Sequence, residues 1–96
     1  MKESEKVLER NLNKDVKALG GWSIKILSNF ITGLPDRLVL LNGRAYFVEV
    51  KSEGKKPSAR QRVVHKKLEA LGFPVTIIDT TEKLDNFIKK INKYFV

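Results

Sequence analysis

Hydrophobic residues recur at helical spacing near the start of the chain. The apolar positions that share one face are Leu8, Leu12, Val16 and Leu19. This spacing predicts an amphipathic helix over residues 3–19. Gly20 and Gly21 follow directly, and glycine readily adopts the left-handed conformation that ends many helices.

Three segments with the pattern of β-strands follow this helix. They cover residues 22–27, 37–41 and 44–51, and residues 28–35 form a loop before the second strand. Asn42-Gly43 separates the second and third strands and is the strongest short signal for a hairpin turn. The second and third strands are therefore expected to pair in antiparallel fashion.

The second half of the chain predicts a helix, a strand and a last helix. Ser58 and Gln61 have the spacing of a capping box, so the helix begins there, and it ends at Gly72. Residues 73–78 are almost wholly apolar, which is expected of a strand buried on both faces. Thr80 or Thr81 caps the last helix. Its inner face is expected to consist of Leu84, Phe87, Ile88, Ile91 and Tyr94 or Phe95. The sequence thus predicts a single α/β domain over residues 1–96, with a mixed sheet flanked by helices.

The amino-acid composition limits the kinds of metal site and binding partner that the protein can have. The chain has 19 Lys and Arg against 11 Asp and Glu, a net charge of +8, no cysteine and a single histidine. Disulfides and thiolate metal sites are excluded, and a histidine-based zinc centre is disfavoured. No apolar run approaches the roughly 20 residues of a membrane span, and the charged start MKESEKVLERN is unlike a secretory signal. We therefore expect a protein of the reducing cytoplasm or nucleus. The positive charge favours a polyanion, nucleic acid first and an acidic membrane surface second.

Asp36, Glu49 and Lys51 are three of the charged residues in the otherwise hydrophobic hairpin segment. Glu49 and Lys51 share one face of their strand, because side chains alternate. The turn pairs positions whose numbers add to about 85, so Asp36 is expected opposite Glu49. Facing carboxylates repel unless a cation lies between them, and Mg²⁺ is the simplest such cation. Lys51 could then hold the attacking water or the scissile phosphate. Taken singly, each group has an ordinary explanation as a turn residue or a solvated surface pair.

These residues match a known signature. Pro35-Asp36, with Glu49-Val50-Lys51 starting thirteen positions after Asp36, matches the PD-(D/E)XK nuclease motif. The longer series GLPDRLVLLNGRAYFVEVKSEGKKPSARQ followed by LEALGFPVTIIDT resembles the virus-type replication-repair nuclease (VRR-NUC) family, in which G-x-PD, E-x-K and S-x-x-Q motifs recur in this order. The resemblance covers residues 5 to about 87. It implies a restriction-endonuclease-like core of order αβββαβ(α) and Mg²⁺-dependent cleavage of DNA, with Mn²⁺ as a substitute.

The resemblance also implies roles for individual residues. Asp36, Glu49 and the Val50 carbonyl would hold the metal, and Lys51 would orient the nucleophile and stabilise the charge of the transition state. A glutamate of the first helix would reach the metal directly or through water.

Two residues compete for this helix carboxylate. Glu9 is preferred, because its distance from Gly20 resembles the spacing in archaeal Holliday-junction resolvases. Glu5, three positions before Leu8, is the alternative. Either can also be an ordinary solvated charge near the start of the helix.

Gln61 has two interpretations that stay open. As part of the capping box it needs no other role, but it shares a helical face with Val64, Leu68 and Leu71, so its amide can also reach the sheet. The resemblance suggests an active-site or phosphate contact. His65 is expected on the helix surface, off this inner face.

Basic residues gather after the third strand and along the second helix. They are Lys55, Lys56, Arg60, Arg62, Lys66 and Lys67. With Ser58 at the helix start, Lys55, Lys56, Arg60 and Arg62 are the predicted DNA contacts, unless they are only a solvated face. A second basic group at Lys89, Lys90 and Lys93 is the alternative track.

The resemblance further implies a homodimer that prefers branched DNA such as a Holliday junction. The apolar C-terminal residues Ile91, Tyr94, Phe95 and Val96 could supply part of the interface. Two alternatives remain, a generic nicking or restriction-type nuclease on duplex DNA and a non-catalytic basic DNA-binding module.

Overall fold

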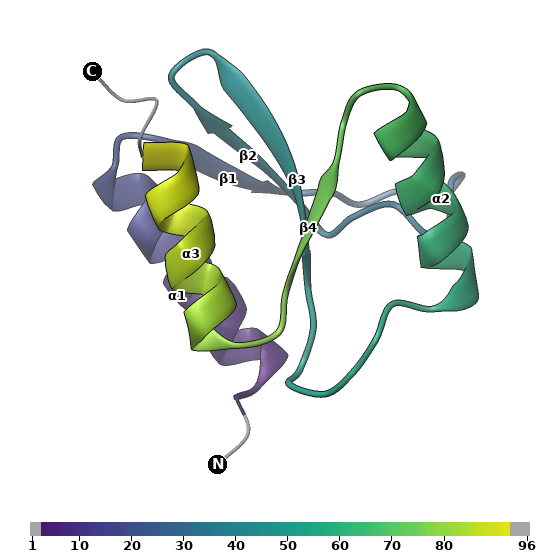
Figure 1. Cartoon of the computed structure of the whole chain (residues 1–96), viewed down its shortest axis with the longest axis horizontal. Helices are drawn as coiled ribbons and strands as arrows, with labels where there is room; N and C mark the ends of the chain where they lie inside the picture. Colours follow the sequence, from purple (N-terminus) through teal and green to yellow (C-terminus); the bar gives the residue numbers. More distant parts are fainter. Residues whose placement is uncertain (1–2, 93–96) are drawn as a thin grey trace.

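The order of helices and strands is the one predicted from the sequence (Figure 1). The structure is a computed structural model that describes residues 3–92. Its elements are α1 (Glu5–Ala18), β1 (Trp22–Lys25), β2 (Arg37–Leu41), β3 (Arg44–Val50), α2 (Ala59–Ala70), β4 (Val75–Ile78) and α3 (Thr81–Asn92). Helices α1 and α3 lie together on one side of the sheet and α2 lies on the other. None of the helices within residues 3–92 is long and apolar enough to cross a membrane.

The sheet is mixed, as predicted. Its strand order is β1-β2-β3-β4, with antiparallel pairs β1–β2 and β2–β3 and a parallel pair β3–β4. Arg37 pairs with Val48 and Leu41 with Arg44, so the hairpin has the predicted register. Asn42, the first turn residue, has a φ of 52°, which suits the tight turn between β2 and β3.

Strand β4 corrects one prediction. The apolar run 73–78 was expected to be buried on both faces, but only Ile78 of β4 is buried and the other three residues are partly exposed. The reason is its position, because β4 pairs with β3 alone and forms an edge of the sheet.

The helix ends follow local capping chemistry. The Ser4 hydroxyl accepts a hydrogen bond from the Val7 amide, which begins α1 two residues after the predicted start. The Thr80 hydroxyl accepts one from the Lys83 amide at 3.1 Å, so Thr80 rather than Thr81 caps α3. Thr81 instead donates through its amide to the Glu3 carboxylate, which ties the start of α3 to the segment before α1.

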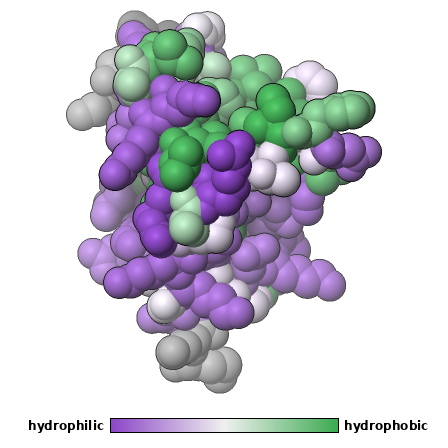
Figure 2. All heavy atoms as spheres, turned by 90° about the vertical axis from the view of Figure 1, so that its right-hand side faces the viewer, coloured by the Kyte–Doolittle hydropathy of each residue, from purple (hydrophilic) through white to green (hydrophobic). Residues whose placement is uncertain are grey.

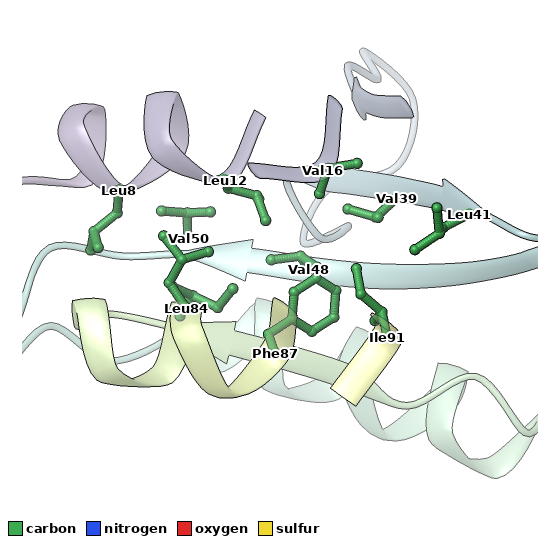
Figure 3. Packing of buried hydrophobic residues seen from close by; sticks show 11 residues of the cluster. Leu8, Leu12, Val16, Val39, Leu41, Val48, Val50, Leu84, Phe87 and Ile91 are labelled. Atoms are coloured by element: carbon green, nitrogen blue, oxygen red, sulfur yellow. The ribbon is translucent and has the colours of Figure 1, made fainter. Parts of the chain in front are cut away.

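The hydrophobic core lies between the sheet and the pair of helices α1 and α3 (Figure 3). Leu8, Leu12 and Val16 of α1 have no solvent exposure, which confirms the predicted stripe except for Leu19, which is only partly buried. Each such side chain contributes roughly 1.5–3 kcal/mol. The inner face of α3 consists of Leu84, Phe87 and Ile91, with Ile88 partly buried. The predicted continuation to Tyr94 or Phe95 lies outside the described residues.

Candidate active site

Glu49 is the centre of the site. Its neighbours Val48 and Val50 point into the core beneath α1 and α3. Because side chains alternate along a strand, Glu49 points to the opposite face, towards α2, where its side chain is 0% exposed. The Gln61 amide donates a 3.0 Å hydrogen bond to Glu49 Oε2, and the Lys51 ammonium lies 3.6 Å from the same oxygen.

Asp36 precedes β2 directly and faces Glu49. The pair Arg37–Val48 is the last that β2 makes with β3 at this end, so the next position along each strand brings Asp36 opposite Glu49. Asp36 Oδ2 accepts a 2.9 Å hydrogen bond from the Val50 amide. This bond fixes the carboxylate of Asp36 at the end of β3. The predicted meeting of Asp36, Glu49 and Lys51 is therefore present.

The surroundings keep Glu49 uncharged near neutral pH. Burial raises the pKa of Glu49 from 4.5 to about 8, and the negative charge of Asp36 and hydrogen bonding to it add to the rise. Lys51 acts in the opposite direction without overcoming it. Burial also lowers the pKa of His65 below 6.5, so this imidazole is neutral at pH 7.

The structure corrects the prediction for His65. The histidine was expected on the helix surface, but it is 6% exposed, and its Nε2 lies 3.5 Å from Glu49 Oε1. The sequence did hold the signal, because Gln61 and His65 are four residues apart and therefore share one helical face. Helix α2 is turned so that this face and Val64 both meet the sheet.

Gln61 completes the capping box and also reaches the sheet, so the structure contains both of the contacts that the sequence left open. Its Oε1 accepts a hydrogen bond from the Ser58 amide at 2.8 Å, while Ser58 Oγ accepts one from the Gln61 amide at 3.1 Å. This completes the capping box. The remaining Nε2 group reaches Glu49. The start of α2 is thereby joined to the carboxylate at the centre of the site.

The donor set fits a hard divalent cation. Glu49 Oε1 is buried and has no hydrogen-bond partner within residues 3–92. An unpaired buried oxygen beside a second carboxylate is the arrangement that a cation would relieve. No group of three or more His, Cys, Asp or Glu side chains in the described part of the chain could enclose a metal. Two carboxylates with open positions for water and phosphate oxygen suit Mg²⁺, which is seldom held by a protein cage.

The predicted helix carboxylate is not part of this cluster. Glu9 Oε2 lies 3.2 Å from Arg37 Nε and 3.9 Å from Lys25 Nζ, and its side chain is 22% exposed. The contacts described for residues 3–92 do not join Glu9 to Asp36 or Glu49. The alternative, Glu5, is exposed on the first turn of α1.

The predicted DNA contacts lie beside the cluster. Lys55, Lys56 and Ser58 are exposed in the segment that leads from β3 to α2, and Arg60 and Arg62 are exposed on the first turns of α2. On the side of the molecule from which α2 faces the viewer, hydrophilic surface covers the lower part and hydrophobic surface gathers in the upper part (Figure 2). The alternative group, Lys89 and Lys90, lies on α3 across the sheet, and Lys93 is outside the described residues.

Gly33 explains how the loop before Asp36 fits beneath α2. Its φ is +85°, and a Cβ there would lie 2.8 Å from the Arg60 carbonyl oxygen and 3.0 Å from a Val64 methyl group. Only glycine permits both the positive φ and this close approach. The glycine of the G-x-PD motif therefore sets the distance between the Asp36 loop and the helix that carries Gln61 and His65.

The chain is similar to a phage protein and to a solved protein domain. The chain is 38% identical over 89 residues to "Putative nuclease p44" of Acyrthosiphon pisum secondary endosymbiont phage 1, an alignment that covers 92% of this chain and 95% of that protein. It also superposes on a solved "VRR_NUC domain" with a TM-score of 0.83 and 28% identity, over 91% of this chain and 97% of that one. No protein-family model matches the sequence. Both similarities extend over nearly the whole chain.

Proposed function

Because this chain belongs to the VRR-NUC family of nucleases, we propose that it is a Mg²⁺-dependent endodeoxyribonuclease that hydrolyses phosphodiester bonds in DNA. The observation that carries the proposal is the buried Glu49, which faces Asp36 and has one carboxylate oxygen that accepts no hydrogen bond from the described part of the chain. Two facing carboxylates lower the stability of a folded protein unless a cation lies between them, so their presence at one buried point favours a chemical role.

Asp36, Glu49 and the Val50 carbonyl would hold the ion. When bound, Mg²⁺ acidifies water and neutralises charge on the scissile phosphate. Asp36 is kept in position by the Val50 amide, and Glu49 is oriented by the Gln61 amide. Mn²⁺ would substitute, since it also accepts carboxylate and water ligands.

Lys51 would act on the phosphate. Its side chain is 19% exposed and its ammonium lies beside Glu49 Oε2, so it can face both the cluster and the solvent-exposed side of the site. From there its N–H groups can donate hydrogen bonds to the attacking water or to a phosphate oxygen on which negative charge develops.

Glu9 would act indirectly. Its ion pair with Arg37 fixes the residue that follows Asp36 in the chain, so we assign Glu9 to positioning rather than to direct contact with the ion. Glu9→Gln should therefore slow cleavage more than Glu5→Gln, because Glu5 is an exposed residue of the first helical turn. Equal rates for the two variants would remove Glu9 from the proposal.

We further propose that the protein acts as a homodimer on branched DNA such as a four-way junction. One site cuts one strand, so paired incisions need two chains, and closed two-fold dimers are the commonest assembly. Of the residues expected to add to the interface, Ile91 is 1% exposed and belongs to the core, so it is not available to a partner. Tyr94, Phe95 and Val96 lie outside the described residues. The alternative is a monomeric nuclease that nicks any duplex.

One experiment separates these functions. A labelled four-way junction and a linear duplex of matched sequence are incubated with the protein in Mg²⁺, Mn²⁺ or EDTA, and the mass in solution is measured by light scattering. We expect metal-dependent cleavage, faster on the junction, by a dimer. A species near 11.0 kDa that cuts both substrates equally would favour the generic nuclease. Tight binding without cleavage in any metal would leave only the DNA-binding module.

A further inference from the structure

The loop that joins β1 to β2 presents large hydrophobic side chains to solvent. Leu27 is 82% exposed, Phe30 is 97% exposed and Ile31 is 53% exposed. Single exposed apolar residues are common on protein surfaces, but a cluster in one short loop commonly marks an interaction site. The segment from residue 26 to residue 35 contains no charged residue. We call it the Phe30 loop.

The Phe30 loop is held in place at its base and on its flank. At the base, the Ile26 amide donates a 2.8 Å hydrogen bond to the Asp36 carbonyl, so the loop closes on the proposed metal ligand. On the flank, Arg60 Nε donates to Thr32 Oγ1 at 3.1 Å, and Gly33 packs under the backbone of α2. The apolar tip is therefore presented from a fixed position beside the site.

The conformation of the tip turns the aromatic ring outward. Ser28 Oγ accepts hydrogen bonds from the amides of Phe30 at 3.2 Å and Ile31 at 3.0 Å. These two bonds satisfy the backbone of the turn locally. The Phe30 side chain then has nearly all of its surface free to contact a partner.

The charges nearby favour a nucleic acid over a second copy of this chain. The loop lies against the first turns of α2, where Arg60 and Arg62 are exposed. Two copies that met at this flank would bring their Arg60 and Arg62 side chains together, so like charges would repel. An aromatic ring beside cations is instead the arrangement that binds a base by stacking and its phosphate by charge.

We propose that the Phe30 loop recognises DNA by stacking the Phe30 ring on a base that is unpaired or easily unstacked next to the cleaved strand. This inference rests on the proposed function and assigns the side chain that would recognise a branch, gap or mismatch beside the cut. In continuous duplex a base must first be unstacked, at a cost of a few kcal/mol per step. At a branch point that cost is largely absent, so the loop gives a preference for branched DNA.

The test uses a junction with 2-aminopurine at the branch point, a fluorescent base whose emission falls when it stacks. Binding is measured in EDTA, so that no cutting occurs, for the wild type, Phe30→Ala and Phe30→Tyr. The control is Leu71→Ala, which removes an apolar side chain that is 70% exposed at the far end of α2. Because Phe30 contacts little else, its variants should melt at the wild-type temperature.

We expect Phe30→Ala to weaken junction binding by roughly 5- to 100-fold and to abolish the fluorescence change, with linear-duplex binding unaltered. Phe30→Tyr and Leu71→Ala should behave as the wild type does. Wild-type affinity and quenching in Phe30→Ala would overturn the proposal, as would a shift of Phe30→Ala from dimer to monomer.

Failure of this inference and failure of the nuclease proposal give different results. If only the loop assignment is wrong, Phe30→Ala still cleaves the junction in Mg²⁺ at the wild-type rate. If only the nuclease proposal is wrong, the wild type quenches 2-aminopurine in EDTA through Phe30 but does not cut DNA in any metal.

Discussion

Glu49 is a residue whose burial lowers the stability of the fold but favours the binding of a metal ion. A carboxyl group with 0% exposure is costly to ionise, and Asp36 beside it increases that cost. In the protein without a bound cation this carboxyl group stays protonated near neutral pH. A divalent cation would reverse the balance by favouring the ionised form. The residue is therefore poorly suited to stabilising the fold and well suited to binding a metal.

The raised pKa of Glu49 predicts a pH dependence of stability. In the unfolded chain Glu49 ionises near its ordinary value of 4.5, whereas in the folded protein it ionises near 8. Between these values the unfolded state binds fewer protons, so the free energy of unfolding falls as pH rises, by about 1.4 kcal/mol per pH unit at most. Glu49→Gln removes this contribution and should become progressively more stable than the wild type from about pH 5 to 8.

Urea denaturation of both proteins in EDTA across this pH range checks that expectation. The difference between them isolates Glu49, because other groups titrate in both proteins. Parallel stability curves would show that the carboxyl group is not held in its neutral form.

Two substitutions should separate the contribution of Gln61 to the helix cap from its hydrogen bond to Glu49. Gln61→Glu keeps a side-chain oxygen for the capping box but loses the donor to Glu49. We expect roughly a tenfold or greater loss of cleavage rate, since a hydrogen bond to the ionised Glu49 of the metal-bound state would be worth about 1.5–3 kcal/mol. The new carboxylate would also repel those of Asp36 and Glu49. Gln61→Ala should lose the cap as well and melt at a lower temperature. If Gln61→Glu cleaves as fast as the wild type, the contact with Glu49 is only structural.

Among helices and strands, the sequence pattern predicted the features that depend on residues close together in the chain, such as the turn between β2 and β3. The Asn42-Gly43 turn sets the β2–β3 register, and this register alone is enough to predict that Asp36 lies opposite Glu49. The edge position of β4 was missed, because it depends on which strand pairs with β3. His65 was missed because its face was judged from the apolar residues of α2, while Gln61, one turn earlier, already marked the face that meets Glu49.

The contact between the Asp36 loop and α2 gives an element-scale prediction. Gly33→Ala should destabilise the protein through its positive φ and through collision with the Arg60 carbonyl, and should slow cleavage by displacing Asp36. Gly20→Ala is the matched control, because Gly20 has φ +86° against +85° for Gly33 and no atom within 4 Å of its added Cβ.

Both variants should lose about 1 kcal/mol to backbone strain, and Gly33→Ala should lose more. Thermal unfolding and cleavage rates measure the two effects. If Gly33→Ala and Gly20→Ala lose equal stability and Gly33→Ala cleaves at the wild-type rate, the position of Asp36 does not depend on the packing of Gly33 beneath α2.

At the scale of the whole molecule, the distribution of positive charge should decide where DNA lies. Lys55 and Lys56 are exposed on the segment that leads from β3 to α2, whereas Lys89 and Lys90 lie on α3 across the sheet. Substituting the first pair with alanine should weaken binding to all DNA sequences alike. The salt dependence, as the slope of log K against log salt, should flatten by about one unit for each DNA phosphate that the variant no longer neutralises.

The matched control is the double alanine variant of Lys89 and Lys90, which removes the same charge from the other side of the sheet. Its salt dependence should equal that of the wild type. If the control flattens the slope and the Lys55 and Lys56 variant does not, DNA binds over α3 and the proposed track is wrong.

A Mg²⁺ titration of four-way-junction cleavage distinguishes a metal site formed by Asp36 and Glu49 from any other arrangement. The wild type is compared with Asp36→Asn, Glu49→Gln and a control, Glu82→Gln, whose exposed carboxylate lies on the first turn of α3. We predict that both site variants bind the junction but cleave it roughly 100-fold more slowly or worse at every Mg²⁺ concentration, while the control matches the wild type. If the wild type cleaves in EDTA, or if either site variant cleaves at the wild-type rate, Asp36 and Glu49 do not form the metal site.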